Sequence, residues 1–238
     1  MIETDKPLCF LLAGGEGSRL KSLTKDTCKP LIKICSYYHL IDFSLLNCLY
    51  SNIFNIAIVV QYESIDLIKY LLETNISTLS NIYILPPETK LNNKENIVYK
   101  NTAHSVYMNK SVVEDEIEDI LVLSADHIYA MNYNNFYEDH KNKGADLSIA
   151  HVDVPIEEAY RFGIFDFDEN GTIESFEEKP ENPKTNHASM GIYIFKKQLL
   201  FDVLDGGEVT HSVIGNDLCI HKGVKIKNSV LMDKCIIK

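Results

Sequence analysis

The sequence has no tryptophan, no pair of cysteines spaced as C-x-x-C and no long apolar run. No hydrophobic stretch approaches the roughly 20 residues that span a bilayer. The short apolar run near the amino terminus is interrupted by Gly14 and Gly15 and lacks the flanks of a secretory leader. Most of the six cysteines lie within apolar runs, which is typical of reduced, buried thiols. These absences predict a cytoplasmic protein.

Basic charge is also scarce. The chain has 23 Lys and Arg against 34 Asp and Glu, a formal net charge of -11. This balance argues against a nucleic-acid groove, although a few cations and backbone N–H groups can still converge on a phosphate. The 238 residues, 45% hydrophobic and 24% charged, predict a globular protein with one large domain or one domain plus a small appendage.

Apolar runs typical of strands alternate with helical patterns through most of the chain. Strands are predicted over residues 7–13, 55–60, 81–85, 120–124, 145–152 and 189–195, and helices over 39–50, 64–73, 102–113 and 133–143. The sequence Asp168-Glu169-Asn170-Gly171 predicts a hairpin between residues 163–167 and 172–176. This alternation predicts an α/β fold with a mostly parallel sheet, helices on both faces and ligands at the carboxyl ends of the strands.

The tail after Gly207 has a different pattern, in which apolar residues recur every sixth position. One series is Ile214, Ile220, Ile226 and Met232, and the other is Leu218, Val224, Val230 and Ile236. A period of six is the signature of a parallel β-helix, and the alternative is an alternating hairpin. We therefore expect one domain over residues 1–207 and a β-helix fragment over 208–238. An exposed β-helix edge invites pairing with another chain, which predicts an oligomer.

A glycine-rich loop directly after the first strand carries the strongest chemical signal. It reads Leu12-Ala13-Gly14-Gly15-Glu16-Gly17-Ser18-Arg19-Leu20. Glycines let backbone N–H groups crowd around a phosphate chain, and Arg19 can neutralise its charge. Leu20 stands where a dinucleotide-binding loop has its third glycine, and no G-K-[ST] follows as in a P-loop. A plain strand-to-helix turn remains an alternative, but it explains neither the three glycines nor the arginine.

Two further motifs place charge near strand ends. Asp126, in Ser124-Ala125-Asp126-His127, follows a buried strand, where a carboxylate can hold Mg²⁺ against nucleotide phosphates. The alternative is an aspartate that caps the next turn. We expect a structural role for His127, because Mg²⁺ prefers oxygen ligands. The segment Glu177-Glu178-Lys179-Pro180 is either a binding motif or a solvated charge run.

Together these motifs resemble those of sugar-1-phosphate nucleotidyltransferases, and of ADP-glucose pyrophosphorylases in particular. The loop followed by Lys29-Pro30-Leu31 is similar to the family signature, and further similarity lies in residues 40–48, 60–62, 125–129, 154–159, 176–180 and 188–193. The resemblance extends from Leu11 to about Leu204. It implies a Rossmann-like nucleotidyltransferase sheet followed by a stub of left-handed β-helix. It also implies that ATP and α-D-glucose 1-phosphate are converted with Mg²⁺ to ADP-glucose and pyrophosphate for glycogen synthesis.

The resemblance implies a role for individual residues. Those expected to bind the nucleotide are Leu12, Ala13, Gly14, Gly15, Gly17, Arg19 and Lys29. Those expected to bind the sugar phosphate are Tyr99, Gly163, Glu178, Lys179 and Ser189. Asp126 is the expected metal ligand, and it is expected to act in catalysis with Arg19 and Lys179.

Some positions depart from the family pattern. Asn101 and His104 replace a usual glycine and aspartate, Ala125 replaces a glycine, and Pro87-Glu88 replaces a pattern whose glutamine faces adenine. These changes leave the choice of base open. A transferase that uses another base or sugar is therefore an alternative, although the segments over 40–48 and 188–193 argue against it.

The largest departure is a gap. Roughly a hundred residues, far more than a connecting loop, normally separate the strand over 189–195 from the β-helix, and here residues 196–208 take their place. The missing stretch holds the second metal aspartate, beside a tryptophan, and Asp202, Asp205 and Asp217 are the remaining candidates. The gap supports another alternative, a catalytically impaired partner or regulatory subunit, or a remnant. We expect a homo-oligomer, or a hetero-oligomer with a related subunit, that binds neither nucleic acid nor membrane.

Overall fold

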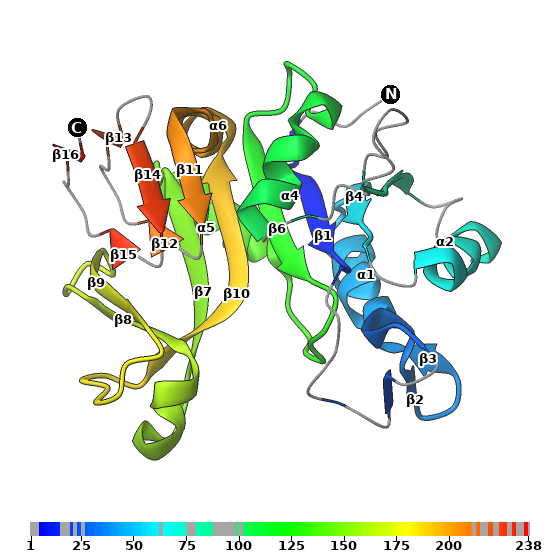
Figure 1. Ribbon diagram of the computed structural model, residues 1–238, viewed down its shortest axis with the longest axis horizontal. Helices are drawn as coiled ribbons and strands as arrows, with labels where there is room; N and C mark the ends of the chain where they lie inside the picture. Colours follow the sequence, from blue (N-terminus) through cyan, green and yellow to red (C-terminus); the bar gives the residue numbers. More distant parts are fainter. Residues whose placement is uncertain are drawn as a thin grey trace.

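The computed structural model describes most of the chain and all of residues 102–210. The described residues are 5–14, 20, 23–24, 27–61, 64–74, 80–87, 99, 102–210, 213–214, 219–220, 224–227, 230–231 and 236–237. An eight-stranded sheet runs through the molecule, with helices packed on it (Figure 1). Within the described part of the chain, no helix has the length and apolar character needed to cross a membrane.

One half of the sheet is parallel. Its strands, in the order β5-β4-β1-β6, are β5 (Asn81–Leu85), β4 (Asn55–Val59), β1 (Leu8–Leu12) and β6 (Asp119–Ser124). The chain moves outward from β1 through β4 to β5 and then returns to β6 on the other side of β1. Such a reversal opens a crevice at the carboxyl ends of the central strands, which is where α/β proteins bind ligands.

The other half of the sheet is antiparallel. Its strands are β7 (Leu147–Asp153), β8 (Gly163–Phe167), β9 (Ile173–Glu178) and β10 (His187–Lys196). Strand β10 runs antiparallel to β6, β7 and β8. Strand β7 therefore points the same way as β6, as a β-α-β crossover requires, but β10 is inserted between them. The predicted α/β sheet is confirmed as a mixed sheet whose central strands β4, β1 and β6 are parallel, whereas local sequence does not indicate the insertion of β10.

Helices cover both faces of the sheet, as predicted. Those on one face are α1 (Leu40–Tyr50), α2 (Ser64–Glu73) and α5 (Tyr133–Lys143), and those on the other are α4 (Thr102–Met108) and α6 (Lys197–Gly206). Alternate residues of each strand enter separate cores, so that in β1 Leu11 packs on the first face and Phe10 on the second. Helix α6 replaces what the sequence suggested was only a short connection.

Two predicted elements show how local chemistry determines structure. The hairpin between β8 and β9 forms, and the Asp168 carboxylate accepts hydrogen bonds from the backbone N–H groups of Asn170 and Thr172 at 2.9 and 2.8 Å. Gly171 has a φ of 78°, a conformation that glycine adopts without strain. The helix predicted over 102–113 instead ends at Met108 and is followed by a short 3-10 turn, Lys110–Val112.

Short strands in the tail pair in parallel. They join β11 (Gly207–Thr210) to β14 (Val224–Lys227), β12 (Val213–Ile214) to β15 (Val230–Leu231), and β13 (Cys219–Ile220) to β16 (Ile236–Ile237). A hairpin would pair its strands antiparallel. The side chains of residues 205–238, including those of both six-residue apolar series, lie outside the described part of the structure.

Candidate functional site

The predicted site residues approach one another at the carboxyl ends of β1, β4 and β6. The Ala13 N–H donates to the Val59 carbonyl at 2.8 Å, and the Ala125 N–H donates to the Leu12 carbonyl at 3.0 Å. The start of the glycine loop therefore lies directly beside the segment that carries Asp126. A Cβ on Gly14 would come within 3.0 Å of the Gln61 Cβ, so the close approach of these two chains favours glycine. Gly15, Gly17 and Arg19 lie outside the described residues.

Lys29 and Asp126 form the central charge pair of the site. Lys29 begins a 3-10 turn (Lys29–Leu31), and its Nζ lies 2.5 Å from Asp126 Oδ2. The Ser124 hydroxyl donates to Asp126 Oδ1 at 2.5 Å, and His127 Nδ1 lies 3.1 Å from the same oxygen. The two side chains are 24% and 31% exposed, so the pair remains accessible to a ligand. Lys29 was predicted to bind the nucleotide and Asp126 the metal, but their contact with each other was not predicted.

The surroundings of Asp126 keep its carboxyl group ionised. Burial raises its pKa, but hydrogen bonds from Lys29 and Ser124 and the charges of His127 and Lys29 outweigh this effect, so the pKa is lowered overall. An ionised carboxylate with partly exposed oxygens is a suitable ligand for Mg²⁺, which takes oxygen ligands and commonly completes its shell with water and substrate phosphates. The donor chemistry of Asp126 therefore fits this ion.

Helix α1 holds the segment that carries Asp126. Ser44 Oγ donates to the Ser124 carbonyl at 3.1 Å, Asn47 Nδ2 donates to the Tyr129 carbonyl at 3.0 Å, and Ser51 Oγ, just after the helix, accepts from the Tyr133 N–H at 2.8 Å. All three polar side chains are buried. Their spacing of three and four residues places them on one helix face. Sequence analysis missed this positioning role, although buried polar residues at helical spacing in an apolar helix were the available signal.

The predicted sugar-phosphate residues gather across the antiparallel half of the sheet. Gly163 lies opposite Glu178, and a Cβ on Gly163 would come within 2.4 Å of Phe176 and 2.9 Å of the Glu178 carboxylate. Ser189 Oγ lies 3.3 Å from the Tyr193 hydroxyl. The pKa of Tyr193 is raised, first by burial and also by the charge of Glu178. Ser189 therefore contacts Tyr193, a residue that was not predicted, and Gly163 lies beside Glu178 on the neighbouring strands.

Lys179 follows Glu178 and has a left-handed backbone conformation. Its φ is 50°, and its N–H donates to the Phe162 carbonyl at 3.0 Å. The Lys179 ammonium pairs with the Glu178 carboxylate, and both side chains are about half exposed. A cation on a held but exposed turn is suited to bind an incoming phosphate.

Tyr99 differs from the other predicted sugar-phosphate residues. Its side chain is buried in the core between the sheet and helices α4 and α6. The hydroxyl donates to the Pro86 carbonyl at 3.0 Å and accepts from Asn109 Nδ2 at 2.9 Å. The Tyr99 carbonyl accepts from Gln61 Nε2 at 3.3 Å. These contacts anchor Gln61 beside Gly14, and binding a sugar phosphate through the hydroxyl would require breaking two internal hydrogen bonds.

Asp202, one of the candidates for a second metal carboxylate, is not near Asp126. Helix α6 begins at the amino end of β6, where the Lys197 N–H donates to the Glu118 carbonyl at 2.7 Å, and Asp126 follows the other end of that strand (Figure 1). Asp202, on α6, accepts from Gln198 Nε2 at 2.8 Å. The suggestion that Asp202 replaces the missing aspartate is therefore wrong. The Asp205 side chain and Asp217 lie outside the described residues.

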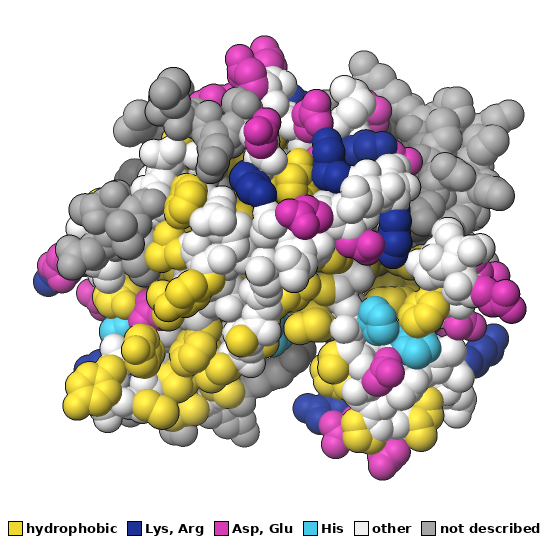
Figure 2. Space-filling model, turned by 180° about the vertical axis from the view of Figure 1, so that it is seen from behind, with side chains coloured by type: hydrophobic (Ala, Val, Ile, Leu, Met, Phe, Trp, Pro, Cys, Tyr) yellow, Lys and Arg dark blue, Asp and Glu magenta, His cyan; other side chains and the backbone are white. Residues whose placement is uncertain are grey.

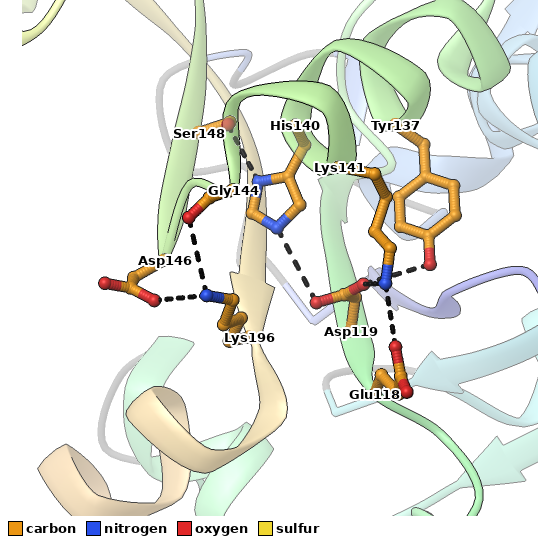
Figure 3. Close-up of polar contacts among 9 residues, drawn as sticks. All are labelled: Glu118, Asp119, Tyr137, His140, Lys141, Gly144, Asp146, Ser148 and Lys196. Carbon is orange, nitrogen blue, oxygen red and sulfur yellow. Dashed lines mark hydrogen bonds and ion pairs between the residues drawn. The ribbon is translucent and has the colours of Figure 1, made fainter.

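A buried polar network closes the amino end of β6 (Figure 3). The Asp119 carboxylate accepts from the Tyr137 hydroxyl at 2.9 Å and lies 3.6 Å from His140 Nε2 and from Lys141 Nζ. A nearby cavity of about 650 Å³ is lined by four carboxylates and two lysines, together with Tyr137 and Asn142. It lies at the opposite end of the sheet from Asp126, and its negative charge is unsuited to a triphosphate.

Comparison with known proteins agrees with this geometry. The chain matches the nucleotidyl transferase family over residues 8–225. It is 40% identical over 217 residues to a glucose-1-phosphate adenylyltransferase of Clostridium perfringens (strain 13 / Type A), covering 89% of this chain and 55% of the relative. It is 44% identical over 202 residues to a protein of the same name from Thermotoga neapolitana, covering 83% and 47%. The chain thus spans about half the length of the curated relatives it matches.

A solved structure shows the same fold. It is a Bacillus anthracis protein, provisionally named glucose-1-phosphate thymidylyltransferase and crystallised with sucrose, which superposes with a TM-score of 0.70 at 21% identity. The similarity covers 83% of this chain and 74% of that one. From the family match, the relatives and the fold together, we conclude that this chain belongs to the nucleotidyl transferase family.

Proposed function

We propose that the chain carries the catalytic domain of a glucose-1-phosphate adenylyltransferase, which makes ADP-glucose and pyrophosphate from ATP and α-D-glucose 1-phosphate. The observation that carries this proposal is the Lys29–Asp126 pair beside the start of the glycine loop, in a chain about 40% identical to proteins of that name. ADP-glucose is an activated glucosyl donor, so the product would serve the synthesis of glycogen or another α-glucan.

The proposed reaction needs no general base. A phosphate oxygen of glucose 1-phosphate, already anionic, attacks the α-phosphorus of ATP. The new P–O bond forms as the bond to the bridging oxygen breaks, and that oxygen leaves with pyrophosphate. Catalysis of this kind rests on positioning and charge neutralisation. We assign charge neutralisation on the triphosphate to Arg19 and Lys29, and positioning of the incoming phosphate to Lys179.

Asp126 is the residue that would hold Mg²⁺, with the substrate phosphates and water completing its shell. When bound, the ion would offset the negative charge of the phosphates. The Ser124 hydroxyl and the Lys29 ammonium keep the Asp126 carboxylate ionised and oriented. Helix α1 fixes the strand end and loop that carry it through Ser44 and Asn47.

The surface at this site supports a two-sided pocket. Figure 2 shows the molecule hollowed between the lobe that contains β8 and β9 and the lobe that contains β2 (Lys33–Ile34) and β3 (Tyr38–His39). The first lobe carries Glu178 and Lys179, and Lys29 precedes the second in the chain. A sugar phosphate and a nucleotide held on opposite walls would meet in this hollow.

A second candidate function is a partner subunit that binds nucleotide with little turnover. The position of Asp202 at the opposite end of the sheet from Asp126 favours it, because Asp202 cannot supply the second metal carboxylate. We also propose that the tail is a β-helix stub through which the chain forms oligomers. The parallel pairing of Gly207 with Val224 and of Val213 with Val230 supports that proposal.

Nucleotide binding is the first test of the proposal. We expect ATP with Mg²⁺ to raise the melting temperature, because a ligand that binds only the folded state stabilises it. Arg19→Ala should remove most of the shift. Arg161→Ala is the matched control, because Arg161 is the other arginine of the chain and its side chain is exposed in the β8–β9 half. No shift with the unaltered chain, or an equal loss in both variants, would contradict the assigned triphosphate site.

A further inference from the structure

A cluster of two histidines and one aspartate lies on adjacent strands, apart from the Asp126 site. His151 and Asp153 are on β7, and His187 begins β10 directly opposite Asp153. Residues two apart on one strand share a face, and so do residues directly opposite each other in an antiparallel pair. The sheet register therefore brings all three side chains to one face, without depending on a flexible loop.

The ligand atoms of these residues converge. His187 Nδ1 lies 2.7 Å from Asp153 Oδ1, His151 Nδ1 lies 3.7 Å from the same oxygen, and the three atoms all lie within 4.8 Å of one another. Around a tetrahedral ion with bonds of about 2.0–2.1 Å, ligand atoms are separated by roughly 3.3 Å. The observed separations bracket this value. The 2.7 Å contact is a hydrogen bond between His187 and Asp153, which a bound ion would replace. The 3.7 Å distance exceeds a hydrogen bond and is close to the separation that an ion shared by His151 and Asp153 requires.

Aromatic side chains support both imidazole rings. The His151 ring contacts Phe165 and Phe167, with centroid distances of 5.5 and 5.4 Å, and the Phe167 ring lies 4.5 Å from that of His187. An apolar shell of this kind fixes ring orientation and limits water around a bound ion. The side chains of His151 and His187 are nevertheless 39% and 24% exposed, which leaves a path for an ion to enter.

We propose that His151, Asp153 and His187 form a binding site for a divalent transition-metal ion such as Zn²⁺, coordinated through both Nδ1 atoms and one carboxylate oxygen. Two imidazoles and one carboxylate suit Zn²⁺ or Fe²⁺, whereas Mg²⁺ prefers oxygen ligands alone. Three protein ligands leave a coordination position open to water or to a ligand oxygen. The site is chemically distinct from Asp126 and does not depend on the proposed adenylyltransferase function.

Ser189 lies next to the cluster, close to the coordination position that the three protein ligands leave open. Ser189, a predicted sugar-phosphate residue, lies opposite His151 and two residues from His187, on the same face of the sheet. On the face seen in Figure 2, histidine side chains gather beside hydrophobic ones on the lobe that contains β8 and β9. A bound ion would link β7 to β10 at the point where Ser189 is presented.

Metal titration of the chelator-treated full chain tests this site. We expect Zn²⁺ to bind by calorimetry with one ion per chain at this site. We expect the ¹⁵N resonances of both rings to report coordination at Nδ1. Substitution of either histidine by glutamine, or Asp153→Asn, should weaken binding by at least about 100-fold. His104→Gln, on α4 away from the cluster, is the control and should bind as the unaltered chain does.

Cobalt distinguishes this site from the cysteines. Co²⁺ bound by the cluster should give d–d absorption without the sulfur-to-metal charge-transfer band that a thiolate produces. Binding that persists in the His151→Gln/His187→Gln double variant, or a spectrum with that band, would overturn the proposal. Because that variant alters a partly exposed cluster, circular dichroism before titration establishes that it is folded. Failure of adenylyl transfer would leave this result unaffected.

Discussion

Lys29 and Asp126 neutralise each other in the structure. A bound nucleotide would compete for this contact, because its phosphates would attract the Lys29 ammonium. The Lys29–Asp126 contact of 2.5 Å joins residues that are far apart in the sequence. An ion pair with partly exposed side chains contributes only about 0–1 kcal/mol to stability. We therefore interpret the pair as a functional arrangement that holds Lys29 beside the proposed triphosphate site and keeps Asp126 ionised, rather than as a structural support.

Removal of the lysine charge should separate these roles. In Lys29→Met we expect pyrophosphate release to fall by about 100-fold or more, because the triphosphate loses a positioned cation. The free energy of unfolding should change by less than about 1 kcal/mol. Lys33→Met is the matched control, because Lys33 is exposed on the adjacent strand β2. Steady-state kinetics and urea denaturation measure the two quantities, and equal losses of activity in both variants would contradict the assignment.

Individual site residues could be predicted where they belong to a sequence motif that resembles the family. Gly163, Glu178 and Ser189 came from the family resemblance, and the structure brings them together. Tyr193 was not predicted, because its hydroxyl contact with Ser189 and its burial depend on packing that local sequence does not encode. Tyr99, in contrast, was predicted to bind the sugar phosphate, but its ring packs in the core.

At the scale of elements, helix α1 links the fold to the site. Its apolar spacing predicted a helix over 39–50, and the structure confirms Leu40–Tyr50. The pattern did not reveal that its buried polar face bonds to the end of β6 and the loop beyond. Buried polar groups cost free energy unless they are paired, so Ser44 and Asn47 fix this loop to the helix. The partners could not be predicted, because they lie about 80 residues further along the chain.

The network at the other end of β6 predicts a defined pH dependence. Burial raises the pKa of Asp119, but His140, Tyr137 and Lys141 outweigh it and lower the pKa below the ordinary 3.8. A lowered pKa in the folded state means that the ionised carboxylate stabilises folding above the ordinary value. That stability is lost as pH falls below 3.8 through the folded-state pKa.

Asp119→Asn tests this network. We expect the substitution to lower the free energy of unfolding by about 2–3 kcal/mol, since it weakens charged contacts to buried partners. The difference should be present near about pH 5 and should shrink below about pH 4. Asp115→Asn is the control, because Asp115 is exposed on the preceding turn. Guanidinium denaturation across this range checks it, and a difference that grows on acidification would contradict the sign.

For the molecule as a whole, the sequence predicted the class and most elements, because buried strands and amphipathic helices have distinct periods. It did not predict the insertion of β10 between β6 and β7, which depends on contacts between distant segments. Helix α6 was also missed, because residues 196–208 were considered only as the remnant of a much longer segment that the family usually has at this place. This shortening places Asp202 at the wrong end of the sheet for metal binding.

The tail leads to a prediction about assembly. Its short parallel strands leave edges that can pair with a second chain. We expect a dimer or larger species whose population rises with concentration, and we expect deletion of residues 210–238 to weaken it. Sedimentation velocity over a range of concentrations measures this. A monomer at every concentration, or an oligomer unchanged by the deletion, would argue against the tail as an interface.

Turnover is the property that separates an enzyme from a nucleotide-binding partner subunit. The proposed site retains the Lys29–Asp126 pair and Glu178, a residue proposed to bind the sugar phosphate, while Asp202 lies too far from Asp126 to supply the second carboxylate. A metal ion held by one carboxylate is less firmly placed, and a misplacement of about 1 Å can cost about 100-fold in rate. We therefore expect slow but real catalysis.

The most direct measurement is pyrophosphate release with ATP, glucose 1-phosphate and Mg²⁺, run in parallel for this chain, its Asp126→Asn variant and the complete Clostridium perfringens relative. We predict that release by this chain requires both substrates, is about 100-fold slower than that of the relative, and falls to background in Asp126→Asn. Circular dichroism establishes that the variant is folded. Equal rates for the chain and Asp126→Asn, or no release that depends on glucose 1-phosphate, would contradict the proposed adenylyltransferase function.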